Sequence, residues 1–170
     1  SAKGECPRVD CAILPDSGYE PKAVYTYLNF LTNILPFPIF KVSKGNIKDD
    51  MISSIDNGTR FPTAPFFTKN ADTGKKGMLR RQCTNDYKIQ PIRQKIRQLS
   101  NVAKGKHFPK DKYVEQWIGI STDEAQRMKP ARDKYILNRH PLIEAKMSRQ
   151  DCIDYLKKND IPLPEKSACI

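Results

Sequence analysis

The apolar positions of the first 43 residues predict a strand, a helix and a second strand. An apolar run over Val9–Leu14 stops at the turn residues Pro15-Asp16-Ser17-Gly18. Over Glu20–Leu35, apolar side chains recur three and four positions apart, as on one helical face: Val24, Tyr27, Leu28, Leu31, Ile34 and Leu35. Pro38–Ser43 is typical of a second strand. This order predicts a parallel pair of strands joined by a crossover helix.

The middle of the chain is less regular. Its spacing predicts a short helix over Asn46–Ile55, and the stretch from Asn57 to Gly77, rich in Gly, Pro, Thr, Asn and Lys, predicts a long loop. A loop of this length is uncommon in a compact domain unless it covers or forms a site. A longer helix follows residues 78–83 and begins or kinks near Pro91. Its expected inward face consists of Ile89, Ile92, Ile96 and Leu99.

A third strand is predicted over Val114–Ile120, with Trp117 packed in the core. Ser121-Thr-Asp-Glu124, which follows it, has the form of a helix N-terminus. Ligands of open parallel sheets collect beyond the carboxyl ends of the strands. If the first and third strands belong to one sheet, the turns after Leu14 and Ile120 therefore lie at the same ligand-binding edge.

The last predicted helix begins at Ser148, three residues before Asp151, and buries Ile153 and Leu156. Together, these elements predict the α/β fold class. A length of 170 residues fits a single domain, which we expect to span 1–170.

Composition narrows the class of protein. The chain is 38% hydrophobic and 29% charged, and no apolar run approaches the roughly 18 residues of a membrane span. No charged-then-apolar signal segment opens it, so we expect a cytoplasmic protein without a membrane partner. Five cysteines, an odd number, favour reduced thiols over a disulfide framework. The net charge of +11 favours anionic partners such as nucleotides, nucleic acid or acidic lipids, or equally a solvated basic surface.

One predicted loop-to-helix junction concentrates the candidate chemistry. Four cations and a thiol gather there: Arg80, Arg81, Cys83, Lys88 and Arg93. Guanidinium groups bind phosphate or sulfate through paired hydrogen bonds, and the amides of a helix start add to such a site. The alternative is a solvated basic helix face. Cys83, amid cations, is either a reactive or metal-binding thiol or a small buried residue.

Several motifs, in the right order along the chain, resemble the phosphoadenosine phosphosulfate reductases and their phage and bacterial relatives. Residues 79–92, Leu-Arg-Arg-Gln-Cys-Thr-Asn-Asp-Tyr-Lys-Ile-Gln-Pro-Ile, are similar to that family's Cys, Lys and Pro segment before a long helix. Asp16-Ser17-Gly18 resembles its Asp-Thr-Gly, and Trp117–Arg127 resembles its Gly-containing strand and acidic turn. Ser148–Pro164 resembles its late helix, and Lys166-Ser-Ala-Cys169 the start of a Cys-x-x-Cys-Pro element. The resemblance implies a three-layer parallel-sheet fold of the adenine nucleotide α-hydrolase (HUP) type.

Two features depart from the family pattern. Its Ser- and Gly-rich phosphate loop after the first strand has no counterpart, because the chain opens at Ser1-Ala-Lys-Gly4, similar to the end of the family's first helix. The chain stops at Cys169-Ile170, before the expected second cysteine. We therefore expect a fold that is incomplete at both ends and a chain that does not turn over a nucleotide alone.

The resemblance also implies roles for individual residues. It places Asp16, Ser17 and Gly18 near the adenosine or the phosphate loop. The cations Arg80, Arg81, Lys88 and Arg93 would approach the anionic groups, with Lys88 and Cys83 in catalytic positions, and Asp123 and Arg127 would lie at the end of the next strand. Cys83 and Cys169 would be metal or cluster ligands. The alternatives are a turn for Asp16, a helix cap for Asp123 and an ion pair for Arg127.

The function implied is binding of an adenine nucleotide, ATP or phosphoadenosine phosphosulfate, with magnesium. The reaction is adenylyl transfer, as in ATP pyrophosphatases, or reductive sulfur chemistry, and an iron-sulfur cluster or zinc is a possible further cofactor. A different class, a nucleic-acid-binding or modification-associated module, is suggested by the charge and by four cations on one predicted helix: Lys88, Arg93, Lys95 and Arg97. A noncatalytic homologue is the third alternative. The sequence leaves the oligomeric state open.

Overall fold

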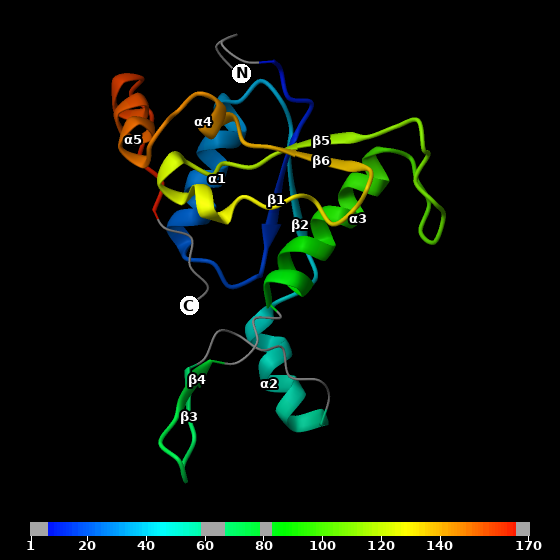
Figure 1. The fold of residues 1–170 in the computed structure, drawn as a ribbon, viewed down its shortest axis with the longest axis vertical. Coiled ribbons are helices and arrows are strands. Elements are labelled where there is room, and N and C mark those ends of the chain that lie inside the picture. The colour runs from blue at the N-terminus through cyan, green and yellow to red at the C-terminus, as the bar shows by residue number, and fades with distance from the viewer. Residues whose placement is uncertain (1–6, 59–66, 79–82, 166–170) are drawn as a thin grey trace. The chain divides into compact units, whose positions relative to one another are not determined.

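A computed structural model describes residues 7–58, 67–78 and 83–165 (Figure 1). The chain divides into two compact units: residues 1–99 together with 165–170 form the first unit, and Ser100–Pro164 form the second. Among the described residues, no helix combines the length and the apolar character needed to cross a bilayer.

The first unit begins with the predicted strand, helix and strand. Strands β1 (Ala12–Asp16) and β2 (Ile39–Ser43) pair in parallel, and helix α1 (Lys22–Ile34) connects them. Strand β1 continues through Pro15 to Asp16 rather than stopping at Leu14, because β2 supplies partners up to the pair Asp16–Ser43. Pro15 is tolerated because, among the described strands, β1 pairs with β2 alone, so the missing amide hydrogen interrupts no second ladder there. Most of the predicted apolar face of α1 is half-buried, Ile34 is 47% exposed, and no residue of the helix is fully buried.

Helix α2 (Ile47–Asn57) confirms the predicted short helix. The side-chain oxygen of Asn46 accepts hydrogen bonds from the amides of Lys48 at 2.9 Å and Asp49 at 3.4 Å, so Asn46 caps the helix. The segment predicted as a structureless loop after this helix instead contains an antiparallel hairpin, β3 (Phe67–Lys69) and β4 (Lys76–Met78). Three residues per strand offer too few positions for a two-residue period to be recognised.

The helix expected after residue 83 has two parts. A π-helical segment, η1 (Thr84–Ile89), leads into α3 (Gln90–Leu99), so the regular helix starts beside Pro91, as predicted. Both η1 and α3 pack against β1, and α3 also contacts β2. Ile96 is buried on the inward face, but Leu99 is 43% exposed, because it is the last residue of the helix.

The second unit also contains a parallel strand pair, β5 (Val114–Trp117) and β6 (Ile136–Arg139). Between them lies the 3-10 helix η2 (Thr122–Arg127), and helices α4 (Pro141–Glu144) and α5 (Arg149–Lys158) follow. Strand β5 is shorter than the predicted Val114–Ile120, because its partner β6 ends at Arg139. Strand β6 and helix α4 are not among the elements predicted from the sequence, although Pro141 at the start of α4 is a typical first residue of a helix.

Helix α5 begins as predicted, with a capping box. The Ser148 hydroxyl and the Asp151 carboxylate each accept a hydrogen bond from the other residue's amide. Its predicted buried positions, Ile153 and Leu156, are half-buried. Trp117 is likewise half-buried rather than in a core, since its ring N–H donates to Glu115 at 2.6 Å. The helices and short parallel strands of both units confirm the α/β class.

Candidate functional site

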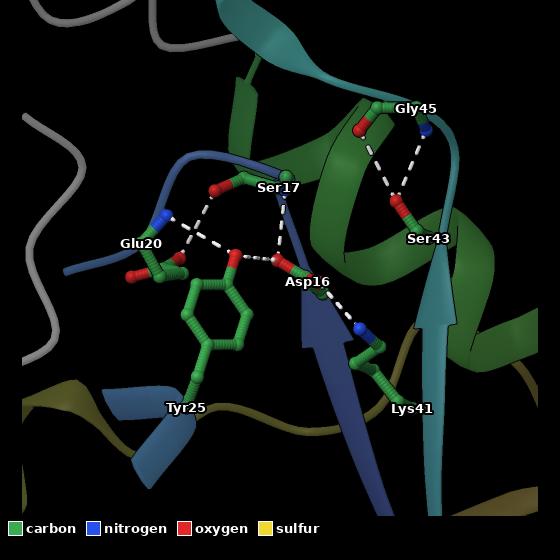
Figure 2. Close-up of polar contacts among 8 residues, drawn as sticks. Asp16, Ser17, Glu20, Tyr25, Lys41, Ser43 and Gly45 are labelled. Atoms are coloured by element: carbon green, nitrogen blue, oxygen red, sulfur yellow. Dashed lines mark hydrogen bonds and ion pairs between the residues drawn. The ribbon is translucent and has the colours of Figure 1, made fainter. Parts of the chain in front are cut away.

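The candidate site is built on the turn that follows β1. Asp16 and Ser17 are among the most buried polar residues described, at 5% and 1% exposure. One carboxylate oxygen of Asp16, Oδ1, accepts hydrogen bonds from the Gly18 amide at 2.8 Å and the Tyr25 hydroxyl at 2.9 Å (Figure 2). The other, Oδ2, lies 3.4 Å from Nζ of Lys41 on the neighbouring strand. A buried carboxylate with every oxygen engaged holds a turn rigidly, because moving it would leave a charge without partners.

Gly18 allows the turn to approach α2 closely. Its φ of +73° lies in the left-handed region, which residues with a Cβ rarely adopt. A Cβ added here would lie 2.8 Å from Cα of Asn46, the residue that caps α2. The amide of Ile47 donates to the carbonyl of Ser17 at 2.9 Å. The start of α2 is therefore joined directly to the turn.

A short polar chain links this turn to η1. The Ser17 hydroxyl donates to Oε1 of Glu20 at 3.0 Å, and Nζ of Lys88 lies 3.7 Å from the same oxygen (Figure 2 shows the Ser17 bond). The Glu20 side chain is 5% exposed, whereas that of Lys88 is 31% exposed. A distance of 3.7 Å is too long for a hydrogen bond, so the contact is electrostatic. The Lys88 ammonium can therefore keep Glu20 as a counter-ion and still donate hydrogen bonds to a second anion.

Segment η1 is anchored by a small core. Cys83 and Tyr87, at 7% and 1% exposure, pack with Ile47 of α2. The Tyr87 hydroxyl makes a short hydrogen bond to Oδ2 of Asp50, also on α2. Burial, and then this bond, raise the pKa of Tyr87 well above the ordinary tyrosine value. Tyr87 thus joins α2 to the segment that carries Lys88.

Lysines surround this edge, each near a carboxylate. Nζ of Lys44 lies 4.0 Å from Oδ2 of Asp86 and 4.8 Å from the centre of the Tyr87 ring. The side chains of Lys41 and Lys44 are about half exposed, at 54% and 49%. The pair between Lys44 and Asp86 is partly exposed and long, so a multivalent anion can compete for the Lys44 ammonium at small cost, whereas Lys41 stays with the buried Asp16. The arrangement is suited to binding an oxyanion beside a rigid, buried turn.

The structure brings together five of the residues singled out from sequence: Asp16, Ser17, Gly18, Cys83 and Lys88. Arg80, Arg81 and Cys169 lie outside the described residues. Arg93 is half-buried on α3. Of the four cations that suggested a nucleic-acid-binding helix, Lys88 faces Glu20, and Nζ of Lys95 lies 4.1 Å from the centre of the Phe40 ring.

Asp123 and Arg127 belong to the second unit and make structural contacts there. Oδ2 of Asp123 accepts a hydrogen bond from the Arg149 amide at 2.5 Å, so it caps the first turn of α5. Arg127 forms an ion pair with Glu124 at 2.6 Å. These contacts match the helix-cap and ion-pair alternatives, and their place in a nucleotide site stays a prediction.

Sequence reasoning missed Glu20, Tyr25, Lys41 and Tyr87. Glu20 had a usable signal, because Ser17-Gly-Tyr-Glu20 has the spacing of a capping box. In the structure, however, the Ser17 hydroxyl donates to Glu20 directly. Tyr25 on α1 and Lys41 on β2 contact Asp16 from elements that follow it in the sequence, and no local spacing encodes such contacts.

The proposed metal ligands stay a prediction. Among residues 7–58, 67–78 and 83–165, no group of three or more His, Cys, Asp or Glu is placed to hold a metal ion. Cys83 packs against Ile47 and Tyr87, surroundings that fit a core thiol rather than a ligand. No protein-family model, curated protein or solved structure shows significant similarity to the chain.

Proposed function

We propose that the first unit binds an adenine nucleotide, ATP or phosphoadenosine phosphosulfate, at the carboxyl edge of β1 and β2. The observation that carries the proposal is the chain from Ser17 through Glu20 to Lys88. It places a partly exposed ammonium beside a buried polar turn at the edge where parallel sheets bind ligands. Ser17 and Lys88 also lie in the segments that resemble the phosphoadenosine phosphosulfate reductases and their relatives.

In this proposal, each residue has a limited role. Lys88 donates hydrogen bonds to a phosphate or sulfate oxygen, while Glu20 holds its ammonium in place. Asp16 organises the turn and does not fit a magnesium ligand, because both of its oxygens are engaged. Cys83, at 7% exposure, is not placed to attack a substrate, so no covalent step is assigned to it. We propose binding and positioning of the nucleotide, with adenylyl transfer or sulfur chemistry as the reaction class that the resemblance implies.

Isothermal titration calorimetry of the chain with each nucleotide tests the proposal. Lys88→Gln should weaken binding roughly ten- to hundredfold, because a hydrogen bond to a charged group contributes about 1.5–3 kcal/mol. Lys69→Gln is the matched control, since it removes the same charge from an exposed strand of the hairpin. Absence of binding to both nucleotides, or equal weakening by the two variants, would contradict the proposal.

A further inference from the structure

The second unit concentrates its positive charge in two segments. Residues 104–112 and 129–134 contain seven Lys and Arg against two Asp, whereas the rest of Ser100–Pro164 contains six Lys and Arg against seven Asp and Glu. All seven cationic side chains are exposed: Lys104, Lys106, Lys110, Lys112, Lys129, Arg132 and Lys134. We call these two segments the basic surface. The charge is therefore localised and is not a general property of the unit.

The two segments lie side by side. One directly precedes β5 and the other β6, and because these strands are parallel, both segments lie at the same end of the pair (Figure 1). The rings of Phe108 and Tyr135 stack with their centres 4.1 Å apart and their planes 5° from parallel. The Val114 amide donates to the Tyr135 carbonyl at 2.7 Å. These contacts hold the two groups of cations together as one surface.

The basic surface also offers places for flat apolar groups. Tyr113, directly after Lys112, is 68% exposed, although burial of its ring would be favourable. An open hollow adjoins the second segment and has an apolar wall formed by Met128, Ile136 and Leu137. Lys129 and Lys134 line the same hollow, and the Asn138 side chain donates to the Lys129 carbonyl at 2.9 Å. Cations thus lie beside both an exposed ring and an apolar hollow.

We propose that the basic surface binds single-stranded nucleic acid. The Lys and Arg side chains contact phosphates, and Tyr113 stacks on a base. Unpaired bases expose the faces that an aromatic ring needs, whereas a duplex hides them, so the combination of charge and ring favours a single strand. The proposal concerns the second unit alone, and it is independent of nucleotide binding at β1 and β2.

Fluorescence anisotropy of a labelled 20-nucleotide oligo-deoxythymidine, titrated with the full chain at several KCl concentrations, tests the proposal. Replacing Lys110, Lys112 and Lys134 together by Gln should weaken binding at least tenfold. It should also make the slope of log affinity against log salt shallower by about two, as expected for three lost phosphate contacts. Tyr113→Ala should weaken binding about five- to hundredfold. Tyr113→Trp keeps an aromatic ring at this position and should bind like the parent chain.

The matched control removes three charges elsewhere in the unit, by replacing exposed Lys146, Lys157 and Lys158 with Gln. It should change the affinity less than about twofold, since these side chains lie outside the basic surface. Circular dichroism of each variant checks that it is folded, and Lys104→Gln with Lys106→Gln replaces the triple variant if that does not fold. Absence of oligonucleotide binding, equal weakening by the two triple variants, or unchanged binding by Tyr113→Ala would overturn the proposal. The proposal would also be overturned if the chain sedimented with phosphatidylserine vesicles but did not bind the oligonucleotide.

Discussion

Replacing Gly18 by alanine tests the description of the turn after β1. The substitution has two separable costs. A residue with a Cβ loses about 1–2 kcal/mol in the left-handed region that Gly18 occupies. The added Cβ would also lie 2.8 Å from Cα of Asn46 and 3.0 Å from the Gly45 carbonyl oxygen. Both neighbours are backbone atoms, so relief requires the start of α2 to move, and overpacking of this kind costs about 1–3 kcal/mol.

Gly58→Ala is the matched control. Gly58 ends α2 with a φ of +59°, and among the described residues no atom lies within 4 Å of an added Cβ. This variant therefore reports the conformational cost alone. We expect Gly58→Ala to lower the free energy of unfolding by about 1–2 kcal/mol and Gly18→Ala by about 2–5 kcal/mol. The larger value is a substantial part of the roughly 5–15 kcal/mol that stabilises a typical domain.

Urea unfolding followed by far-ultraviolet circular dichroism measures the two free energies. Hydrogen exchange of the Ile47 amide provides a local measurement, because this amide donates to the Ser17 carbonyl. Gly18→Ala should accelerate its exchange, whereas Gly58→Ala should leave it closer to the parent rate. If the two variants lose equal stability and the Ile47 amide exchanges alike in both, the close approach of the turn to α2 is refuted.

Three further predictions concern side-chain contacts. Tyr87→Phe should lower the free energy of unfolding at pH 7 by about 1.5–3 kcal/mol through loss of a bond to a carboxylate. Because the folded chain raises the pKa of Tyr87, its contribution is complete below pH 10 and declines above it, so urea midpoints at pH 9 and 11 should differ less in the variant. Ser148→Ala should lower the free energy of unfolding by about 1 kcal/mol, because a helix cap is lost. It should also raise the pKa of Asp151 in an NMR titration, because the hydrogen bond from the Ser148 hydroxyl is the main reason that this pKa is low. Arg139→Gln should raise the depressed pKa of Glu144 in the same titration with little change in the urea midpoint, since the Glu144 side chain is exposed and that of Arg139 is partly exposed.

The parts of the fold that sequence predicts well are those with local signals. The strand, helix and strand of the first unit follow from apolar spacing, and the start of α5 follows from the Ser148 and Asp151 pair. Strands of three or four residues, such as β3, β4 and β6, are too short to show a period. The pairing of β6 is decided by β5, a partner distant in sequence, and that contact is invisible to a local pattern.

The candidate site shows the same division. Asp16, Ser17 and Gly18 are recognisable as turn residues, and Lys88 as part of a cationic segment. The contact between Lys41 and Asp16 depends on the register of β1 against β2, which pairs Asp16 with Ser43. Trp117 shows the opposite failure. Its apolar neighbours suggest a core, yet its N–H donates to Glu115 and the Arg139 guanidinium lies 5.6 Å from its ring.

An NMR titration can show whether an adenine nucleotide binds at the carboxyl edge of β1 and β2, as we propose. Amide chemical shifts of the isotopically labelled chain are followed as ATP or phosphoadenosine phosphosulfate is added. We expect the largest changes at residues 16–20, 44–47 and 84–90, and we expect Lys88→Gln to reduce them at equal ligand concentration. Unchanged shifts with both nucleotides, or changes confined to residues 100–164, would contradict this proposal.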